Sequence, residues 1–237
     1  MSTPIATIAE LWRYPVKGMR GERLDALQLD AYGIAGDRRW AIQSTGAPRG
    51  KPMLSGAERA SMLLFSASGA GAGQSTVVTS PNGAQCSITD PALLNSLRQH
   101  LPGGHDLKLL QSETPMTDVR PVAVLSTATI RQLSEELGQP VDPRRFRANI
   151  LLAFPSENEG FAEDELVDRS IQLGAEAVLR ITERDPRCRI VTLDPETAIA
   201  DPLLMKHLDR RHEGHVGVYA TVERTGWLRA GDPVVPL

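Results

Sequence analysis

Apolar residues along this chain occur in short runs, separated by glycine, proline and small polar residues. Such a pattern is typical of β-strands joined by turns, because a long helix needs a sustained helical period. Residues 75–88 predict a hairpin, since two β-prone runs meet at an Asn-Gly pair that favours a tight turn. Residues 90–101 predict a short helix with Asp90 as N-cap and Pro91 at its first position. Further strands of the first half are predicted at residues 5–16, 23–29, 38–43, 61–67 and 106–110.

The second half combines strands with two helices. Residues 126–138 predict a helix that has Ser126 or Thr127 as its N-cap and ends at Gly138. A second helix is predicted at residues 201–212. Strands are predicted at residues 121–125, 145–154, 170–183, 189–193, 215–223 and 232–237.

A polar stretch from Ser112 to Arg120 separates the two halves. We therefore expect two domains, residues 1–112 and residues 113–237. The many short strands and few helices predict a mostly β fold of the α+β class, with a barrel-like architecture.

Composition and charge exclude several classes of protein. The chain has 237 residues, a formal net charge of −3 and a pI of about 6.0, so no general field attracts nucleic acid. No stretch is apolar enough to span a membrane, and the N-terminus lacks the pattern of a secretion signal. Two cysteines are too few for a disulfide framework or for a four-cysteine metal site. A reducing, cytoplasmic location is expected, where a Cys86–Cys188 disulfide would be unusual.

Cys188 lies in the segment DPRCRIVTLDPETA, between two arginines and directly after Pro186. A thiolate is a nucleophile and a soft metal ligand, and nearby cations lower its pKa. Adjacent side chains of a strand point to opposite faces, so only one of Arg187 and Arg189 could face the thiol. Free cysteine is also among the most buried residue types. On residue type alone a structural role is the more frequent case, and for Cys86, which has no clustered cations, it is the expected one.

Three basic segments, YPVKG, GDRRW and DPRRFRANI, adjoin predicted strands, where loops converge at one end of a β scaffold. Lys17, Arg38 and Arg147 could together bind an anion, because lysine and the arginine fork recognise phosphate well. The helix that starts at Ser126 and Thr127 adds backbone amides of the kind that bind phosphate. The alternative is that these arginines lie on a solvated rim and that the hydroxyl only caps the helix.

Other polar clusters predict no site. The carboxylates of EDELVD are expected to form a solvated acidic turn. His207, His212 and His215 lack the spacing of a helical metal pair and have no neighbouring cysteines, so zinc binding is not expected there. The glycine-rich residues 66–75 lack the Lys-Ser/Thr pair of a phosphate-binding loop.

The order of six segments is similar to that of the MOSC family, which is named after the C-terminal domain of molybdenum cofactor sulfurases. These segments are YPVKG, GDRRWAI, RFRANILL, GFAEDELVDRSIQLG, DPRCRIVTLDPETA and GVYATVERTGWLRAGDPV. The first two resemble the β-barrel domain that precedes MOSC in many members, and the likeness covers nearly the whole chain. It implies a MOSC β-barrel-like domain, a smaller N-terminal β-barrel domain and a few short helices.

The same resemblance implies a site for molybdenum cofactor (molybdopterin). The family cysteine falls on Cys188. In the reductase branch, which includes the mitochondrial amidoxime-reducing component, it ligates molybdenum, and in the sulfurase branch it is proposed to carry a persulfide. The residues expected to hold the pterin and its phosphate are Lys17, Arg38, Ser126, Thr127, Arg147, Asn149 and Arg187. Those expected to shape the site are Glu163, Asp164 and Asp194. The chemistry agrees, because a dithiolene-bound metal with an anionic tail needs a soft thiolate at one end and cations at the other.

Two features depart from the family. Relatives with the preceding barrel often carry a Thr-x-Arg-Gln-like segment where this chain has RGKPMLSGAER, so the substrate is not predicted. The chain also lacks cysteines for an iron–sulfur cluster and a dinucleotide fingerprint, so a reductase of this type would take electrons from a separate partner.

Three functions remain open. The first is a molybdenum-cofactor oxidoreductase that reduces small N-hydroxylated compounds with electrons from a separate electron-transfer protein or reductase. The second is a sulfur carrier that uses a Cys188 persulfide. It would require a cysteine desulfurase partner, because no pyridoxal-binding lysine motif is evident and pyridoxal phosphate is associated only with the family. The third is a non-catalytic carrier of the cofactor.

Overall fold

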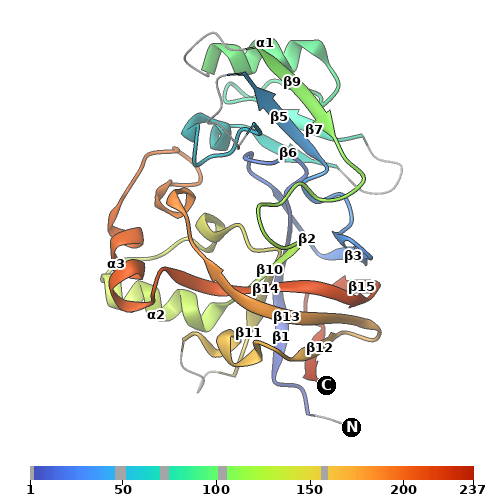
Figure 1. Cartoon of the computed structure of the whole chain (residues 1–237), viewed down its shortest axis with the longest axis vertical. Coiled ribbons are helices and arrows are strands. Elements are labelled where there is room, and N and C mark those ends of the chain that lie inside the picture. Colours follow the sequence, from blue (N-terminus) through green and yellow to red (C-terminus); the bar gives the residue numbers. More distant parts are fainter. Residues whose placement is uncertain (1–2, 46–51, 70–74, 101–105, 156–159) are drawn as a thin grey trace.

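The computed structural model describes residues 3–45, 52–69, 75–100, 106–155 and 160–237. The molecule is elongated, with a large barrel at the end that carries both termini and a smaller β region at the other end (Figure 1). No helix of the described ranges is both long and apolar enough to cross a membrane.

The elements follow one another in mostly β order. The strands are β1 (Ala6–Arg13), β2 (Glu22–Leu24), β3 (Ala26–Asp30), β4 (Gly33–Ile34), β5 (Trp40–Ser44), β6 (Ser66–Ser68), β7 (Val77–Thr79), β8 (Gln85–Ser87), β9 (Leu107–Gln111), β10 (Val122–Ser126), β11 (Ile150–Ala153), β12 (Ser170–Leu173), β13 (Ala177–Pro186), β14 (His215–Arg224), β15 (Gly226–Arg229) and β16 (Pro233–Pro236). The α-helices of the described residues are α1 (Pro91–His100), α2 (Thr127–Leu137) and α3 (Leu203–Arg211). Short 3₁₀ helices span Ala60–Leu64, Pro143–Phe146, Ala162–Leu166 and Arg189–Thr192.

A closed barrel forms the larger part of the molecule. Its strands follow the order β11-β10-β14-β13-β12-β16-β1, and β1 pairs back onto β11, with β2 added at one side. The pair β10–β11 is parallel, which requires a crossover, and α2 lies in that crossover. Closure removes the exposed sheet edges that would otherwise pair with other chains.

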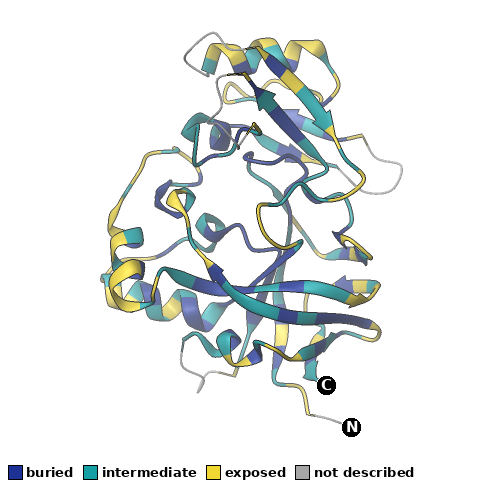
Figure 2. Ribbon diagram, in the orientation of Figure 1, coloured by how far each residue is buried: buried dark blue, intermediate teal, exposed yellow. Residues whose placement is uncertain are grey.

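Apolar side chains fill this barrel. Ile8, Val124, Ile150, Leu179 and Val218 come from five different strands and are at most 1% exposed. Burial alternates along β1 and β12, as expected for strands with one face on a core. Figure 2 shows buried positions running along β13 and β14, whereas the outer faces of α1 and α3 are exposed.

The smaller region has its own core. The ribbon β5–β9 and the sheet β6-β7-β8 enclose Met62, Phe65 and Val78, and α1 contributes Leu93 and Leu97. The sheet β15-β3-β4 is a separate three-stranded unit that joins first-half strands to one from the end of the chain.

Most predicted elements are confirmed. The mostly β class, the hairpin β7–β8 and the helices α1, α2 and α3 are present. Ser126, not Thr127, is the N-cap of α2, and Gly138 ends the helix in the left-handed conformation. Residues 70–74 of the glycine-rich segment and residues 49–51 of RGKPMLSGAER lie outside the described residues.

Three predicted strands are wrong in part or in whole. Of residues 189–193, Arg189–Thr192 form a 3₁₀ helix and not a strand, and of residues 61–67 only the last two lie in a strand, because a 3₁₀ helix spans Ala60–Leu64. Of residues 145–154 only β11 is strand, because Asp142 caps a preceding 3₁₀ helix that has Pro143 at its start. The division into residues 1–112 and 113–237 stays a prediction, and β1 pairs with strands of the second half.

Candidate functional site

Segments that are far apart in sequence meet at the end of the barrel that faces the smaller region (Figure 1). Tyr14 follows β1, Arg38 precedes β5, and Arg147 lies just before β11. The guanidinium carbons of Arg38 and Arg147 lie 4.9 and 4.4 Å from the centre of the Tyr14 ring. Cys188 lies at the end of β13, close enough to Arg147 to affect its pKa. Arg38 and Arg147 therefore share the Tyr14 ring, whereas Cys188 is the smallest of the named influences on the Arg147 pKa.

Both arginines adopt a backbone conformation that is uncommon for residues other than glycine. The φ angles are +48° for Arg38 and +54° for Arg147. Surrounding hydrogen bonds hold these conformations: the Arg38 amide donates to the Tyr14 carbonyl at 2.7 Å, and Arg147 Nη1 donates to the Met19 carbonyl at 2.8 Å. Strained positions of this kind cluster at functional sites.

Asp37 organises the base of this cluster. Its side chain is fully buried and accepts hydrogen bonds from the Tyr14 amide at 2.7 Å, from Asn149 Nδ2 at 3.1 Å and from Arg38. Burial works against the charge of Arg38, but Asp37 outweighs it and raises the Arg38 pKa. Asn149 also donates to the Trp12 carbonyl and accepts from the Ala123 amide. The side-chain amide of Asn149 therefore makes its hydrogen bonds to other groups of the protein.

Arg147 differs from Arg38 in its electrostatics. Arg147 forms no salt bridge among the described residues, although only 9% of its surface is exposed to solvent. Burial and then the charge of Arg38 lower its pKa to about 10, so it stays charged at neutral pH. Tyr14, Asp37 and Cys188 offset this only in part. An anion bound beside Arg147 would relieve the cost of this buried positive charge.

Cys188 is exposed and is therefore not a core residue. It precedes the 3₁₀ helix Arg189–Thr192 in extended conformation, with φ −112° and ψ 178°, and its side chain makes no capping hydrogen bond. Cys86 is half-buried in β8, and burial raises the pKa of its thiol. The two thiols thus differ as the sequence predicts, with the accessible one next to a cation.

Arg187 points into the protein. It donates to the carbonyls of Val216 and Phe146, forms a salt bridge of 2.7 Å with Asp185, and covers the Phe146 ring. Its role in this structure is to fix the segment that carries Cys188. Asp185 is only 2% exposed and its Oδ1 has no hydrogen-bond partner in the described part of the chain. Burial raises the pKa of Asp185, and the charge of Arg187 opposes that rise.

Lys17 and the start of α2 are the remaining residues that the sequence predicts for the anion site. Lys17 is 7% exposed, and its Nζ donates to the Met116 carbonyl at 2.9 Å and to Asp118 at 2.7 Å. Ser126 is fully buried and accepts from the Thr129 amide at 3.1 Å. Thr127 is the half-buried first residue of α2.

The expectation that EDELVD is a solvated turn is wrong for Glu163. This side chain is fully buried beneath the start of α2, where it accepts from Thr129 Oγ1 at 2.8 Å and from the Ser126 amide at 3.2 Å. Burial raises the pKa of Glu163 despite these hydrogen bonds. Asp164 pairs with Arg184 at 2.9 Å. The acidic segment therefore supports α2 from below.

Asp194 organises its own turn. Its Oδ1 accepts from the amides of Glu196 and Thr197 and from the Thr197 hydroxyl, and these bonds lower its pKa. Its other oxygen lies 3.7 Å from Arg145. The structure thus places Asp194 in the loop after Cys188 and does not bring it into the arginine cluster.

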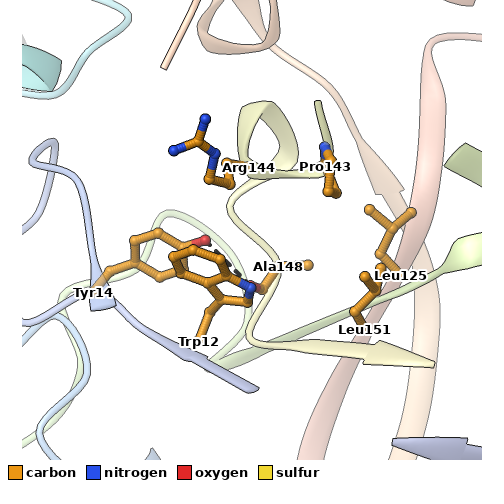
Figure 3. A pocket seen from close by; sticks show the side chains of 7 residues that line it. All are labelled: Trp12, Tyr14, Leu125, Pro143, Arg144, Ala148 and Leu151. Carbon is orange, nitrogen blue, oxygen red and sulfur yellow. Dashed lines mark hydrogen bonds between the residues drawn. The ribbon is translucent and has the colours of Figure 1, made fainter. Parts of the chain in front are cut away.

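A shallow open pocket of about 10 Å³, room for roughly one water molecule, adjoins Tyr14 (Figure 3). The Tyr14 hydroxyl borders it and donates to the Ala148 carbonyl at 3.3 Å. Its lining residues are Trp12, Tyr14, Leu125, Pro143, Arg144, Ala148 and Leu151.

Sequence reasoning missed three members of the site: Tyr14, Asp37 and Asp185. Tyr14 opens YPVKG and Asp37 precedes Arg38 in GDRRW, so both lie inside motifs that the sequence singles out. Nothing in the local pattern indicates that these polar side chains are buried, since burial depends on contacts between distant segments.

Comparison with known proteins agrees with the fold. Residues 111–235 match the MOSC domain, and residues 5–91 match the MOSC N-terminal beta barrel domain. The chain belongs to the MOSC domain family, and the predicted fold is confirmed.

The chain is similar to proteins named mitochondrial amidoxime reducing components. It is 24% identical to component 2 from Bos taurus, over 97% of this chain and 83% of that protein. It is 32% identical to component 1 from Xenopus laevis, over 49% of this chain and 36% of that protein. The crystal structure of the YuaD protein from Bacillus subtilis has a TM-score of 0.53 and 17% identity, covering 99% of this chain and 97% of the other, which shows a shared fold.

Replacement of Asp37 by asparagine should lower the free energy of unfolding by about 3–5 kcal/mol, because it leaves Arg38 buried without a counter-charge. Urea unfolding measures the change. The control Glu183→Gln breaks the exposed pair with Arg120 and should cost about 0–1 kcal/mol. Equal losses in the two variants would contradict a special role for Asp37.

Buried Glu163 makes the stability depend on pH. Its raised pKa means that the folded state binds its proton more tightly than the unfolded state, whose value lies near 4.5. The stability of the protein should therefore fall as the pH rises from about 4.5 through the raised pKa. Urea unfolding across this range should show a smaller decrease for Glu163→Gln than for the wild type. Parallel curves would exclude Glu163 as the source.

Proposed function

We propose that this MOSC protein binds molybdenum cofactor and reduces small N-hydroxylated compounds with electrons from a separate electron-transfer protein or reductase. The observation that carries the proposal is a buried guanidinium, Arg147, that has no salt bridge among the described residues and whose pKa the exposed Cys188 influences weakly. The names of the curated relatives, which refer to amidoximes, support this class of substrate.

The residues present fit such a cofactor. Cys188 Sγ offers the soft ligand that molybdenum would take, and its exposure leaves room for a large group. Arg147 and Arg38 would bind the anionic end, because arginine binds phosphate through two parallel hydrogen bonds. Lys17 and the first turn of α2 at Thr127 are the further candidates for that end.

Other predicted residues would act by positioning these groups. Asn149 and Asp37 hold Arg38 in place, and Arg187 fixes the segment that leads to Cys188. Ser126 begins α2 as its cap, and Glu163 supports that cap from below. Asp164 and Asp194 would also act by positioning: Asp164 pairs with Arg184, and Asp194 forms the turn that follows the Cys188 segment.

When bound, the cofactor would supply a metal that accepts an electron pair from the partner and passes it to the substrate. Such a reduction would cleave the N–O bond of the substrate with two electrons and two protons, and the oxygen would leave as water. Asp185 lies three residues before Cys188, and its buried carboxylate pairs with Arg187 and so helps to fix the segment that carries the thiol.

A sulfur carrier is the second candidate, favoured by the exposure of Cys188 beside the charge of Arg147. An exposed cysteine is the form that another protein can reach to transfer sulfur. A cysteine desulfurase would then be the partner. The two candidates differ in what Cys188 holds, a metal or a terminal sulfur atom.

Protein purified from molybdenum-sufficient cells should contain molybdenum and pterin close to one per chain, and Cys188→Ser should lose most of the metal while remaining folded. Elemental analysis, pterin fluorescence and circular dichroism measure this. Cys86→Ser is the matched control, because Cys86 lies in the distant hairpin, and it should keep the metal.

Three results would contradict the proposed reductase function or the role of Cys188 in it. A metal-free protein with an added sulfur on Cys188, seen by mass spectrometry, would favour the sulfur carrier. Bound cofactor without turnover of any N-hydroxylated compound under chemical reduction would favour a non-catalytic carrier. Equal molybdenum in Cys188→Ser and Cys86→Ser would contradict the ligand role.

Arg147→Met should reduce the pterin content by at least about tenfold, because it removes a charge-assisted contact in a buried position. Arg144→Met is the matched control, since Arg144 already pairs with Asp142 and Glu196 and is more exposed. It should retain the pterin. Similar pterin contents in both variants would show that Arg147 does not bind the anionic end.

A further inference from the structure

Two histidines and a carboxylate meet at a surface formed by α2 and α3. Glu136 lies in the last turn of α2, His207 lies in α3, and His212 directly follows α3. The Nε2 atoms of His207 and His212 lie 2.5 and 2.7 Å from Glu136 Oε2. The three ligand atoms all lie within 4.8 Å of one another. We call this set the Glu136–His207–His212 cluster.

The sequence argument against zinc considered the spacing of the histidines and the absence of nearby cysteines, but no distant carboxylate. Glu136 is 71 and 76 positions away from its partners, so no local pattern could indicate it. His215, the third histidine of the segment, does not belong to the cluster, and its Nδ1 contacts the Glu213 carbonyl at 2.7 Å.

Neighbouring groups hold the cluster in position. The His212 ring stacks on the Phe161 ring with 4.2 Å between centres and 22° between planes. Gln132 Nε2 donates to Glu136 Oε1 at 2.8 Å, which leaves Oε2 directed at the histidines. The three side chains are 12–21% exposed, so they are partly shielded but accessible from one side. Support of this kind from surrounding residues is what orients ligands in known metal sites.

We propose that the Glu136–His207–His212 cluster is a binding site for a divalent transition-metal ion of the zinc type. Two imidazoles and one carboxylate match the ligands that zinc prefers, and water would complete the coordination from the accessible side. Calcium and magnesium fit poorly, because both prefer a shell of oxygen atoms. This proposal does not depend on molybdenum cofactor and concerns a different part of the surface.

Only a small movement separates the observed arrangement from metal coordination. Ligand atoms of a tetrahedral zinc site lie about 3.3 Å apart, so Oε2 would have to withdraw from each histidine by less than about 1 Å. The imidazole nitrogens would release the protons that they share with Glu136, and the ion would take their place. Binding should therefore weaken at acidic pH, where histidine is protonated.

An ion in this position would join two elements that flank the candidate active site. The helix α2 starts at Ser126, and α3 packs on the 3₁₀ helix that follows Cys188 through Leu204, Leu208 and Val191. The cluster joins the end of α2 to the end of α3. A bound ion would stabilise the folded protein, because the unfolded chain does not hold the three ligands together.

The test is titration of the full chain with Zn²⁺ alone, in a Cys188→Ser background that removes the accessible thiol. Isothermal titration calorimetry and competition with a chromogenic chelator should show one ion per chain at neutral pH. Zinc should also raise the melting temperature. Glu136→Gln, His207→Asn and His212→Asn should each weaken binding by at least about tenfold, since loss of a supporting residue alone has such an effect.

Glu135→Gln and His215→Gln are the matched controls, because each removes the same kind of group from a neighbouring position outside the cluster. Both should bind Zn²⁺ as the Cys188→Ser parent does. Co²⁺ in place of zinc should produce the intense visible absorption of a four-coordinate site, which Glu136→Gln should abolish or shift. The proposal is overturned if the parent binds no zinc, or if the cluster variants and the controls bind it equally.

Discussion

The candidate site depends on keeping two guanidinium groups charged and largely out of water. Arg38 and Arg147 both lie against Tyr14, while one buried carboxylate, Asp37, lies at the base of the cluster. Removing charge from water is costly unless hydrogen bonds and counter-charges compensate. Asp37 compensates Arg38, whereas Arg147 has carbonyl and ring contacts but no salt bridge among the described residues. This imbalance is what the proposed anion-binding role of Arg147 rests on.

Closure of the barrel makes this arrangement possible. Strand β1 comes from the start of the chain, yet it pairs with β11 and places Tyr14 beside Ala148 and Arg147. Asn149 extends the connection, because its side chain joins the backbone of β1 to Asp37. Folding of the barrel and assembly of the arginine cluster are thus the same event.

The helices α2 and α3 connect the two proposed sites. One end of α2 is capped by Ser126 over buried Glu163, and the other end presents Glu136 to the histidines of the α3 segment. Phe161 contributes to both ends, since its amide binds Thr129 and its ring packs on His212. The cofactor proposal and the metal proposal therefore share a scaffold but no ligand, and each can be wrong without the other.

Local rules were sufficient for much of the fold. The Asn-Gly turn, the cap at Asp90, Gly138 at the end of α2 and the alternating strands all act within a few residues, so the sequence alone determined them. The same rules failed for residues 189–193, where an apolar run that favours a strand forms a 3₁₀ helix packed on α3. The family resemblance rested on the order of motifs. It identified the arginines and Cys188 as candidate site residues, but it did not predict their burial or their contacts.

Only the tertiary structure decided the burial of Glu163, the exposure of Cys188, the unpaired state of Arg147 and the meeting of Glu136 with two histidines. The physical reason is common to all four. Charge, pKa and ligand geometry depend on distances between side chains that are far apart in sequence, and the closed barrel sets those distances.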